Sequence, residues 1–252
     1  MRPVGAVTRG TTNPNRLRRV DNWIAYRCGD LLTAAAHPLV VDLGFGATPV
    51  TAIELRERLA SRVRRDVAVV GLEIDPVRVA AALPAADPPR LEFRRGGFEL
   101  AGLRPVVVRA LNVLRQYDEA EVAAAWRTMT ATGAALVEGT CDELGRVAAW
   151  AYVEHGHPLT LTLSARLSDL DHPATFAERL PKALIHHNVP GEPIHDLLRA
   201  LGHAWDVAAG PFGPRQRWRH AAATLHAEGL PLLHEPNRWR LGELTVSWPG
   251  QW

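Results

Sequence analysis

A strand, a glycine turn and a helix follow one another near the start of the chain, and this unit constrains the fold most. The apolar run 39–41 suits a buried strand, and Asp42 stands at its carboxyl end. Gly44 and Gly46 then permit a tight turn and the close approach of a ligand to the backbone. Such a unit predicts an open α/β sheet, in which ligands bind beyond the carboxyl ends of the strands.

A helix is expected directly after this turn. Thr48 is a suitable N-cap residue, and Pro49 suits the first helical position because its missing N–H costs nothing there. Ala52, Leu55 and Leu59 follow at helical spacing. A dinucleotide site would require a third glycine where Pro49 stands, so this alternative is disfavoured.

A second apolar strand, over residues 67–72, ends in Glu73. A carboxylate at this position can accept hydrogen bonds from both hydroxyls of a ribose. Asp75 precedes Pro76 and is interpreted as the N-cap of the next helix.

These two segments resemble motifs of the class I S-adenosylmethionine (SAM)-dependent methyltransferases. Asp-Leu-Gly-Phe-Gly resembles motif I, with Thr48 where the family has its last glycine, and Gly-Leu-Glu-Ile-Asp-Pro resembles motif II. The resemblance implies a Rossmann-like three-layer α/β sandwich with a seven-stranded, mostly parallel sheet whose last strand is antiparallel. It further implies SAM as the cofactor, bound by Asp42, Gly44, Gly46, Thr48 and Glu73.

Two further segments are similar to this family. After a third strand over residues 91–95, the loop 96–99 lacks the acid with which the family often holds adenine. Phe98 is expected to lie against the adenine, with backbone at Gly97 reading the base edge, although core packing of Phe98 is an equal alternative. Asn112 follows a fourth strand and resembles motif IV, so it is expected to contact the cofactor's amino-acid end or the substrate. Alternatively, Asn112 satisfies loop backbone only.

The candidate catalytic residues lie further along the chain. Glu138 is expected at the carboxyl end of a fifth strand, facing the same crevice as Asp42, where it would contact the substrate or accept a proton. A salt bridge with Arg146 or Arg109 is the alternative. Residues 141–146 are expected to begin a helix.

His186 and His187 lie in residues 182–191, the most chemically dense segment of the expected helical insertion. Either is a candidate general base for an acceptor hydroxyl or amine. Adjacent positions on one helix point about 100° apart, so the pair is a poor metal site and no metal is expected.

Four segments are expected along the chain. Residues 1–38 form an N-terminal helical segment or lid, and residues 39–167 form the SAM-binding core. Residues 168–241 are a helical insertion or cap, with helices over 174–185, 192–209 and 215–228. Residues 242–252 carry the final strand, over 243–248.

Arginines in two of these segments offer contacts for anions. The N-terminal segment carries Arg16, Arg19 and Arg27, whose planar guanidinium groups suit carboxylate or phosphate, but a solvated helix that packs on the core is favoured. Trp218 is flanked by Arg215, Arg217 and Arg219, which suit a base or a phosphate, but an ordinary amphipathic helix is favoured.

Composition limits the classes of function. A chain of 252 residues with 47% hydrophobic and 22% charged residues is typical of globular proteins. No run is apolar enough to span a membrane, no signal peptide is recognisable, and the two cysteines lack metal spacing, so a cytoplasmic protein is expected.

A net charge of only +2 does not indicate nucleic-acid binding, which favours a small-molecule acceptor over RNA. The function predicted is methyl transfer to an O or N acceptor. The alternatives are an RNA methyltransferase or a non-catalytic methyltransferase-like binding protein.

Overall fold

The computed structural model describes residues 3–8, 12–211 and 213–249. Within these ranges the strands form one mixed sheet of eight, in the order β3-β2-β1-β4-β5-β6-β7-β8. The strands are β1 (Leu39–Leu43), β2 (Ala68–Glu73), β3 (Leu91–Arg95), β4 (Val107–Leu111), β5 (Ala135–Cys141), β6 (Val147–Glu154), β7 (His157–Ala165) and β8 (Glu243–Ser247). The α-helices are α1 (Arg18–Arg27), α2 (Gly29–Ala34), α3 (Val50–Arg62), α4 (Pro76–Ala82), α5 (Glu119–Thr130), α6 (Lys182–Ile185), α7 (Pro193–Val207), α8 (Pro214–Ala227) and α9 (Pro236–Trp239).

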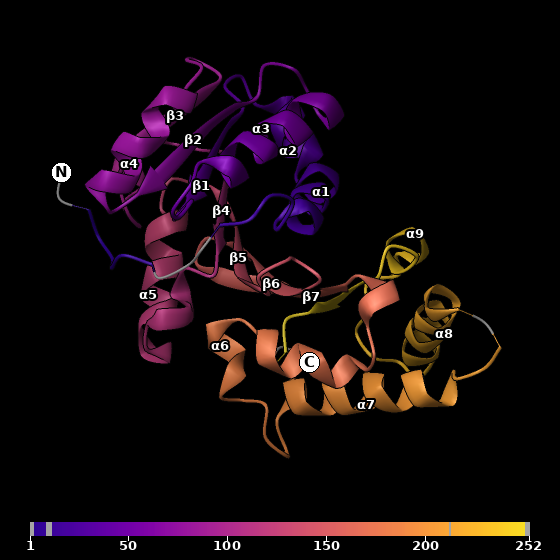
Figure 1. The fold of residues 1–252 in the computed structure, drawn as a ribbon. Coiled ribbons are helices and arrows are strands. Elements are labelled where there is room, and N and C mark those ends of the chain that lie inside the picture. Colours follow the sequence, from indigo (N-terminus) through magenta and orange to yellow (C-terminus); the bar gives the residue numbers. More distant parts are fainter. Residues whose placement is uncertain (1–2, 9–11, 212, 250–252) are drawn as a thin grey trace.

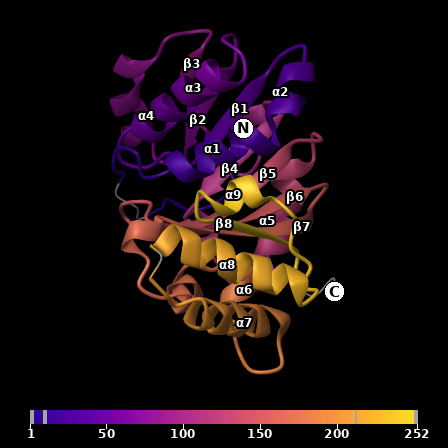
Figure 2. The same cartoon turned by 90° about the vertical axis from the view of Figure 1, so that its right-hand side faces the viewer.

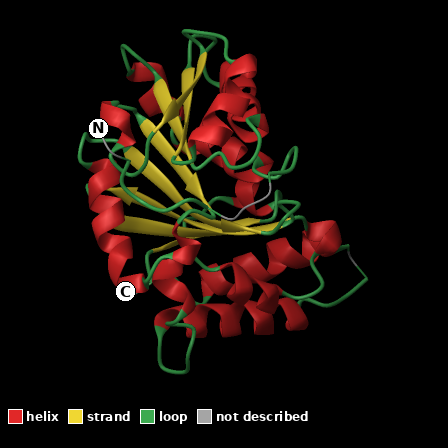
Figure 3. Cartoon of the chain, turned by 60° about the vertical axis from the view of Figure 1, so that its left-hand side comes forward, coloured by secondary structure: helices red, strands yellow, loops and turns green. Residues whose placement is uncertain are grey.

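The first five strands are parallel to one another, and the remaining pairings are antiparallel. Side chains alternate between the two sheet faces, so each face has its own core. Helices α1, α2 and α3 pack on one face, and α5, α7 and α8 pack on the other. In Figure 3 the strands fan between these two sets of helices. The predicted three-layer α/β sandwich is therefore confirmed.

The number of strands differs from the prediction, because residues 147–154 form β6 instead of continuing a helix from Cys141. Asp142 donates its backbone N–H to the carbonyl of Val147, and Gly145 has a φ of +66° in the turn between them. A hairpin therefore joins β5 to β6, and the helix expected over 141–146 was wrong. The apolar side chains of residues 147–153 point alternately to the two faces of the sheet, so β6 contributes to both cores.

The segment between β7 and β8 is helical, as expected, and it packs on the same sheet face as α5. Figure 2 shows α8 beside β8 and α7 beyond it. Residues 174–185 form a 3₁₀ segment (Pro173–Arg179) and the short α6 rather than one helix. The final strand, β8, lies antiparallel to β7, with Thr162 paired to Thr245.

Of the two predicted helix caps, that of Asp75 is confirmed and that of Thr48 is wrong. The Asp75 carboxylate accepts the Val77 N–H at 2.8 Å and caps α4. Thr48 does not cap α3: the helix begins at Val50, Pro49 occupies the N-cap position, and the Thr48 side chain is exposed. None of the helices in the described ranges is long and apolar enough to cross a membrane.

Candidate functional site

The glycine turn after β1 forms the floor of a hollow at the carboxyl ends of β1 and β4. Gly44 and Gly46 have φ values of +71° and +83°, which favour glycine. A Cβ atom on Gly44 would lie 2.9 Å from Val113 Cγ2, so the turn also needs glycine for space. We call this space the Asp42 hollow; its walls include Asp42, Gly44, Gly46, Asn112 and Arg16.

Asp42 is held by a buried guanidinium. Arg109, on β4, contacts both Asp42 carboxylate oxygens, at 2.9 Å and 2.7 Å, and its other Nη binds the Asp21 carboxylate of α1. The Thr51 hydroxyl donates to Asp42 at 3.1 Å. Burial alone would lower the pKa of Arg109, but the two carboxylates more than offset this effect and raise it. Arg109 is therefore charged, and it fixes the Asp42 carboxylate at the edge of the hollow.

Glu73 ends β2 on the same sheet face as Asp42, because Asp42 is paired with Gly71, two residues before Glu73. Its Oε2 accepts the Gly46 N–H at 3.2 Å, and its Oε1 accepts the Ile74 N–H at 2.8 Å. Arg78 lies 3.4 Å from Oε2. The Asp75 N–H also lies 3.4 Å from Oε1, so each oxygen already accepts two hydrogen bonds. The hydroxyls of a ligand would replace the two longest of these contacts, those of Asp75 and Arg78.

A second space, the Phe98 hollow, adjoins the first and shares Gly44 with it. It is lined by Glu73, Ile74, Gly97, Phe98 and Tyr117. The rings of Phe98 and Tyr117 lie 5.3 Å apart, so one wall is aromatic while Glu73 provides the polar edge.

The N-terminal segment lies across the Phe98 hollow. The Phe98 N–H donates to the Val4 carbonyl at 2.9 Å, and the Ala6 N–H donates to the Tyr117 hydroxyl. The free volume is about 40 Å³ in the Asp42 hollow and about 10 Å³ in the Phe98 hollow. A cavity needs about 10–15 Å³ of such free volume to hold one water molecule, so a nucleoside enters only if this segment shifts.

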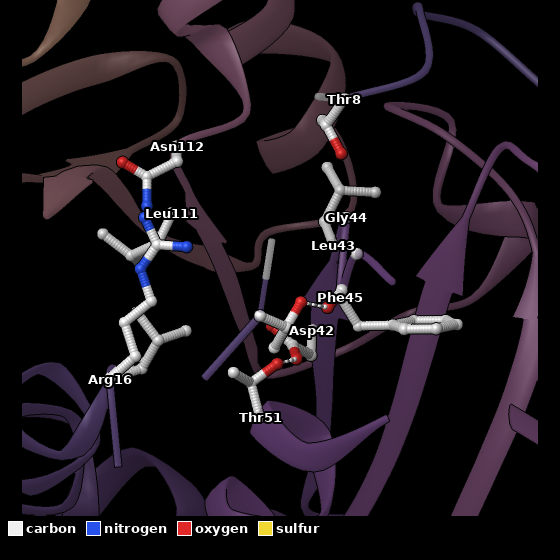
Figure 4. A pocket seen from close by; sticks show the side chains of 12 residues that line it. Thr8, Arg16, Asp42, Leu43, Gly44, Phe45, Thr51, Leu111 and Asn112 are labelled. Carbon is white, nitrogen blue, oxygen red and sulfur yellow. Dashed lines mark hydrogen bonds between the residues drawn. The ribbon is translucent and has the colours of Figure 1, made fainter. Parts of the chain in front are cut away.

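Asn112 and Arg16 form the opposite wall. Figure 4 shows both side chains across the Asp42 hollow from the glycine turn. The Asn112 side-chain oxygen accepts the Cys141 N–H at 3.0 Å, and its backbone N–H donates to the Gly139 carbonyl at 2.7 Å. Arg16 Nε donates to the Asp142 carbonyl at 2.9 Å. Asn112 therefore does bond loop backbone, and it also lines the hollow.

Glu138 does not face this crevice, which corrects the prediction. In the sheet register Asp42 pairs with Arg109 and Arg109 with Val137, so Glu138 points to the other face. It is fully buried under α5, where the Trp126 indole donates to its Oε2 at 3.3 Å, and Oε1 has no hydrogen-bond partner in the part of the chain that the structure describes. Burial raises its pKa to about 8. Neither Arg146 nor Arg109 pairs with it.

His186 and His187 also lie away from the Asp42 hollow, at the end of α6. His187 contacts Glu119 at 2.7 Å and Glu192 at 3.4 Å, and these carboxylates raise its pKa. His186 lies 3.2 Å from the Lys182 amine. Both histidines belong to the surface where α6 meets α5, so their predicted role as general bases lacks support from geometry.

Residues that were not predicted to lie at this site complete it. Arg109 and the Thr51 hydroxyl hold Asp42, Asp21 pairs with Arg109, and the Thr12 hydroxyl donates to the Phe45 carbonyl. One feature of the sequence could have indicated a role for Arg109, namely a charged residue inside the apolar run of β4. Thr48, expected at the cofactor, is exposed and lies outside both hollows.

The residues of the two hollows fit SAM chemically. The apolar and aromatic wall of the Phe98 hollow suits adenine, and Glu73 suits the ribose hydroxyls. Arg16 and Asp42 offer opposite charges to the carboxylate and ammonium of the amino-acid end. Gly97 stays a predicted contact of the cofactor. In the structure the Val4 backbone lies against it, since a Cβ there would lie 2.0 Å from the Val4 carbonyl oxygen.

Comparison with known proteins gives similarity at the level of structure. No protein-family model matches the chain, and no curated protein matches it significantly. A magnesium protoporphyrin IX methyltransferase from Synechocystis, solved with S-adenosylhomocysteine, is 21% identical over 50% of this chain and 54% of its own, with a TM-score of 0.39. A putative methyltransferase of antibiotic biosynthesis from Anabaena variabilis is 20% identical over 52% of this chain and 49% of its own, with a TM-score of 0.33. Human N-acetylserotonin methyltransferase is 19% identical over 52% of this chain and 39% of its own, also with a TM-score of 0.33.

The chain thus spans about half the length of the first solved structures that it matches. These solved structures include methyltransferases with bound SAM or S-adenosylhomocysteine, and the similarity extends over about half of this chain.

Proposed function

We propose that this protein is a SAM-dependent methyltransferase that acts on an oxygen or nitrogen atom of a small-molecule acceptor. One observation carries the proposal: Asp42 and Glu73 end neighbouring parallel strands on one sheet face, and Gly44 joins the hollows that they line. Two acids separated by a glycine turn match the two polar ends of SAM, its amino-acid group and its ribose.

The residues of the site would act by binding and positioning. Glu73 would accept hydrogen bonds from the ribose, and Asp42, held by Arg109, would face the ammonium group. Bound SAM would supply an electrophilic methyl group to the acceptor oxygen or nitrogen and become S-adenosylhomocysteine, and the proton lost by the acceptor would pass to solvent. Asn112 borders both the Asp42 hollow and a larger open hollow, so the acceptor would approach past its side chain. Correct placement alone can supply a large share of such a rate enhancement.

Calorimetry with S-adenosylhomocysteine tests the assignment. We expect the wild-type protein to bind it and Glu73→Gln to bind about tenfold more weakly, because a charged acceptor of two hydrogen bonds is lost. Asp66→Asn is the matched control, since Asp66 lies just before the opposite end of β2 and its side chain is 64% exposed. Equal affinities of wild type and Glu73→Gln would refute the site.

Methyl transfer itself separates an enzyme from a binding protein. Incubating the purified protein with a small-metabolite extract and SAM carrying a deuterated methyl group should yield a labelled product by mass spectrometry. The Glu73→Gln variant should yield less of it. Binding of S-adenosylhomocysteine without any labelled product would favour the non-catalytic alternative, and labelled RNA in a parallel incubation would favour an RNA acceptor.

A further inference from the structure

We propose that the open hollow beside the Asp42 hollow binds an anionic group of the acceptor, a carboxylate or a phosphate, through Arg115 and Arg179. The inference rests on the proposed function, because it names the class of acceptor for that reaction. We call this space the arginine hollow. It shares Arg16 and Asn112 with the Asp42 hollow and has a volume of about 620 Å³, enough for a small metabolite.

Four arginines from separate segments line the arginine hollow, against the two carboxylates of Asp142 and Glu143. Arg16 precedes α1, Arg115 follows β4, Arg146 lies in the β5–β6 turn and Arg179 ends the 3₁₀ segment. Segments far apart in the sequence thus bring positive charge to one place, at the carboxyl ends of β4 and β5.

Two of these arginines already have partners. Arg16 donates to the Asp142 carbonyl at 2.9 Å, and Arg146 Nε lies 3.1 Å from the Asp169 carboxylate. The Asp142 carboxylate accepts the Arg146 backbone N–H at 2.7 Å. These contacts build the rim of the hollow.

The other two arginines are poorly neutralised by the protein. Among the described residues, Arg115 has no hydrogen-bond or ion-pair partner, and the only ion pair of Arg179 is with Glu178, at 3.8 Å. Burial and the charge of Arg179 lower the pKa of Arg115, and the carboxylate of Glu178, which also pairs with Arg179, only partly opposes this effect. The two guanidinium groups therefore repel each other across the hollow. An oxyanion between them would relieve this repulsion and form charge-assisted hydrogen bonds.

The backbone fixes Arg179 relative to the sheet. Its carbonyl accepts the hydroxyl of Thr140, which is fully buried on β5. Arg115 is placed by the short 3₁₀ turn Leu114–Gln116, which begins two residues after Asn112. The anionic group would therefore be anchored on one side of Asn112 while the methyl donor lies on the other.

Titration of the protein with inorganic pyrophosphate and with citrate, at low ionic strength and with S-adenosylhomocysteine present, tests the proposal. We expect at least one probe to bind the wild-type protein. Its affinity should fall about tenfold in Arg115→Gln or Arg179→Gln, and further in the double variant. Arg199→Gln, whose side chain is 73% exposed on α7, should bind like the wild type. The probe that binds more tightly identifies phosphate or carboxylate as the preferred group.

Two results would overturn the proposal: a wild-type protein that binds neither probe, or a double variant that binds both as the wild type does. The affinity of the double variant for S-adenosylhomocysteine is the control for folding, and it should equal that of the wild type. A protein that binds the probes through Arg115 and Arg179 but never binds S-adenosylhomocysteine would contradict the proposed function alone.

Discussion

At the scale of single residues, two buried carboxylates of this protein have opposite surroundings. Asp42 is paired with Arg109, which is in turn paired with Asp21, so its charge is compensated inside the protein. Among the described residues, the Trp126 indole is the only hydrogen-bond partner of the Glu138 side chain, which forms no salt bridge there. The Asp42 carboxylate is therefore fixed by ion pairing, whereas Glu138 is suited to be neutral within the core.

The protonation of Glu138 makes stability depend on pH. Burial raises its pKa from the ordinary value of 4.5 to about 8, so between these values the folded state binds more protons than the unfolded state. The contribution of Glu138 to the free energy of unfolding is therefore fully present below about pH 4.5 and is lost as the pH rises to about 8. Over this range the free energy of unfolding falls by up to about 1.4 kcal/mol per pH unit.

Glu138→Gln retains the acceptor for Trp126 and removes this titration. We expect the free energy of unfolding of the wild type, minus that of Glu138→Gln, to fall as the pH rises from about 5 to about 8. Urea denaturation of both proteins over this pH range measures this difference. Burial also raises the pKa of Glu243, but both proteins contain Glu243, so its effect cancels in the difference. A constant difference would show that Glu138 is ionised in the folded protein.

At the scale of elements, the N-terminal segment and the proposed adenine site compete for the same space. Residues 3–8 cross the Phe98 hollow and are bound there by hydrogen bonds to Phe98 and Tyr117. Binding of the cofactor must therefore include the free energy of moving this segment, which lowers the apparent affinity.

Tyr117→Phe tests this competition, because it removes the hydroxyl that accepts the Ala6 N–H and keeps the aromatic wall. Losing one hydrogen bond should weaken the hold on the segment by about 1 kcal/mol, and S-adenosylhomocysteine should bind up to about fivefold more tightly. Calorimetry measures the affinity. Tyr26→Phe is the control, since the exposed Tyr26 hydroxyl bonds Glu235 instead. Unchanged or weaker affinity in Tyr117→Phe would show that the segment does not compete.

At the scale of the whole molecule, the helical segment between β7 and β8 shares its core with the sheet. Trp205 and Trp218 belong to the same continuous apolar cluster as Val41 and Val108 of the central strands. Figure 1 shows α7 and α8 on the side of the sheet opposite α1, α2 and α3. The helical segment is therefore expected to unfold together with the sheet.

Trp218→Ala should lower the free energy of unfolding by about 3–5 kcal/mol while preserving a single transition. The reason is that Trp218 is fully buried, next to Phe176 and Trp205. Denaturation followed by both fluorescence and circular dichroism would measure it. Val207→Ala, at a position 70% exposed, should change stability by less than about 0.5 kcal/mol. Two separate transitions in Trp218→Ala would indicate that the helical segment folds as an independent domain.

The sequence by itself determined the strand–turn–helix unit, the acids that end β1 and β2, the Asp75 cap and the final strand. Each of these depends on local periodicity or on chemistry within a few residues, which a sequence displays directly. The Asp42–Gly44–Glu73 arrangement followed because parallel strands bring their carboxyl ends to one sheet edge.

Only the tertiary structure decided which face Glu138 occupies, that 147–154 form a hairpin strand, and that Arg109 joins Asp42 to Asp21. A shift of one residue in register moves a side chain to the opposite face, and register is set by long-range pairing between strands. The partners of Arg109 lie 67 and 88 residues away in sequence, and Arg115 and Arg179 meet only when separate segments reach one hollow. Such contacts have no local signature, because only the packing of the sheet brings their members together.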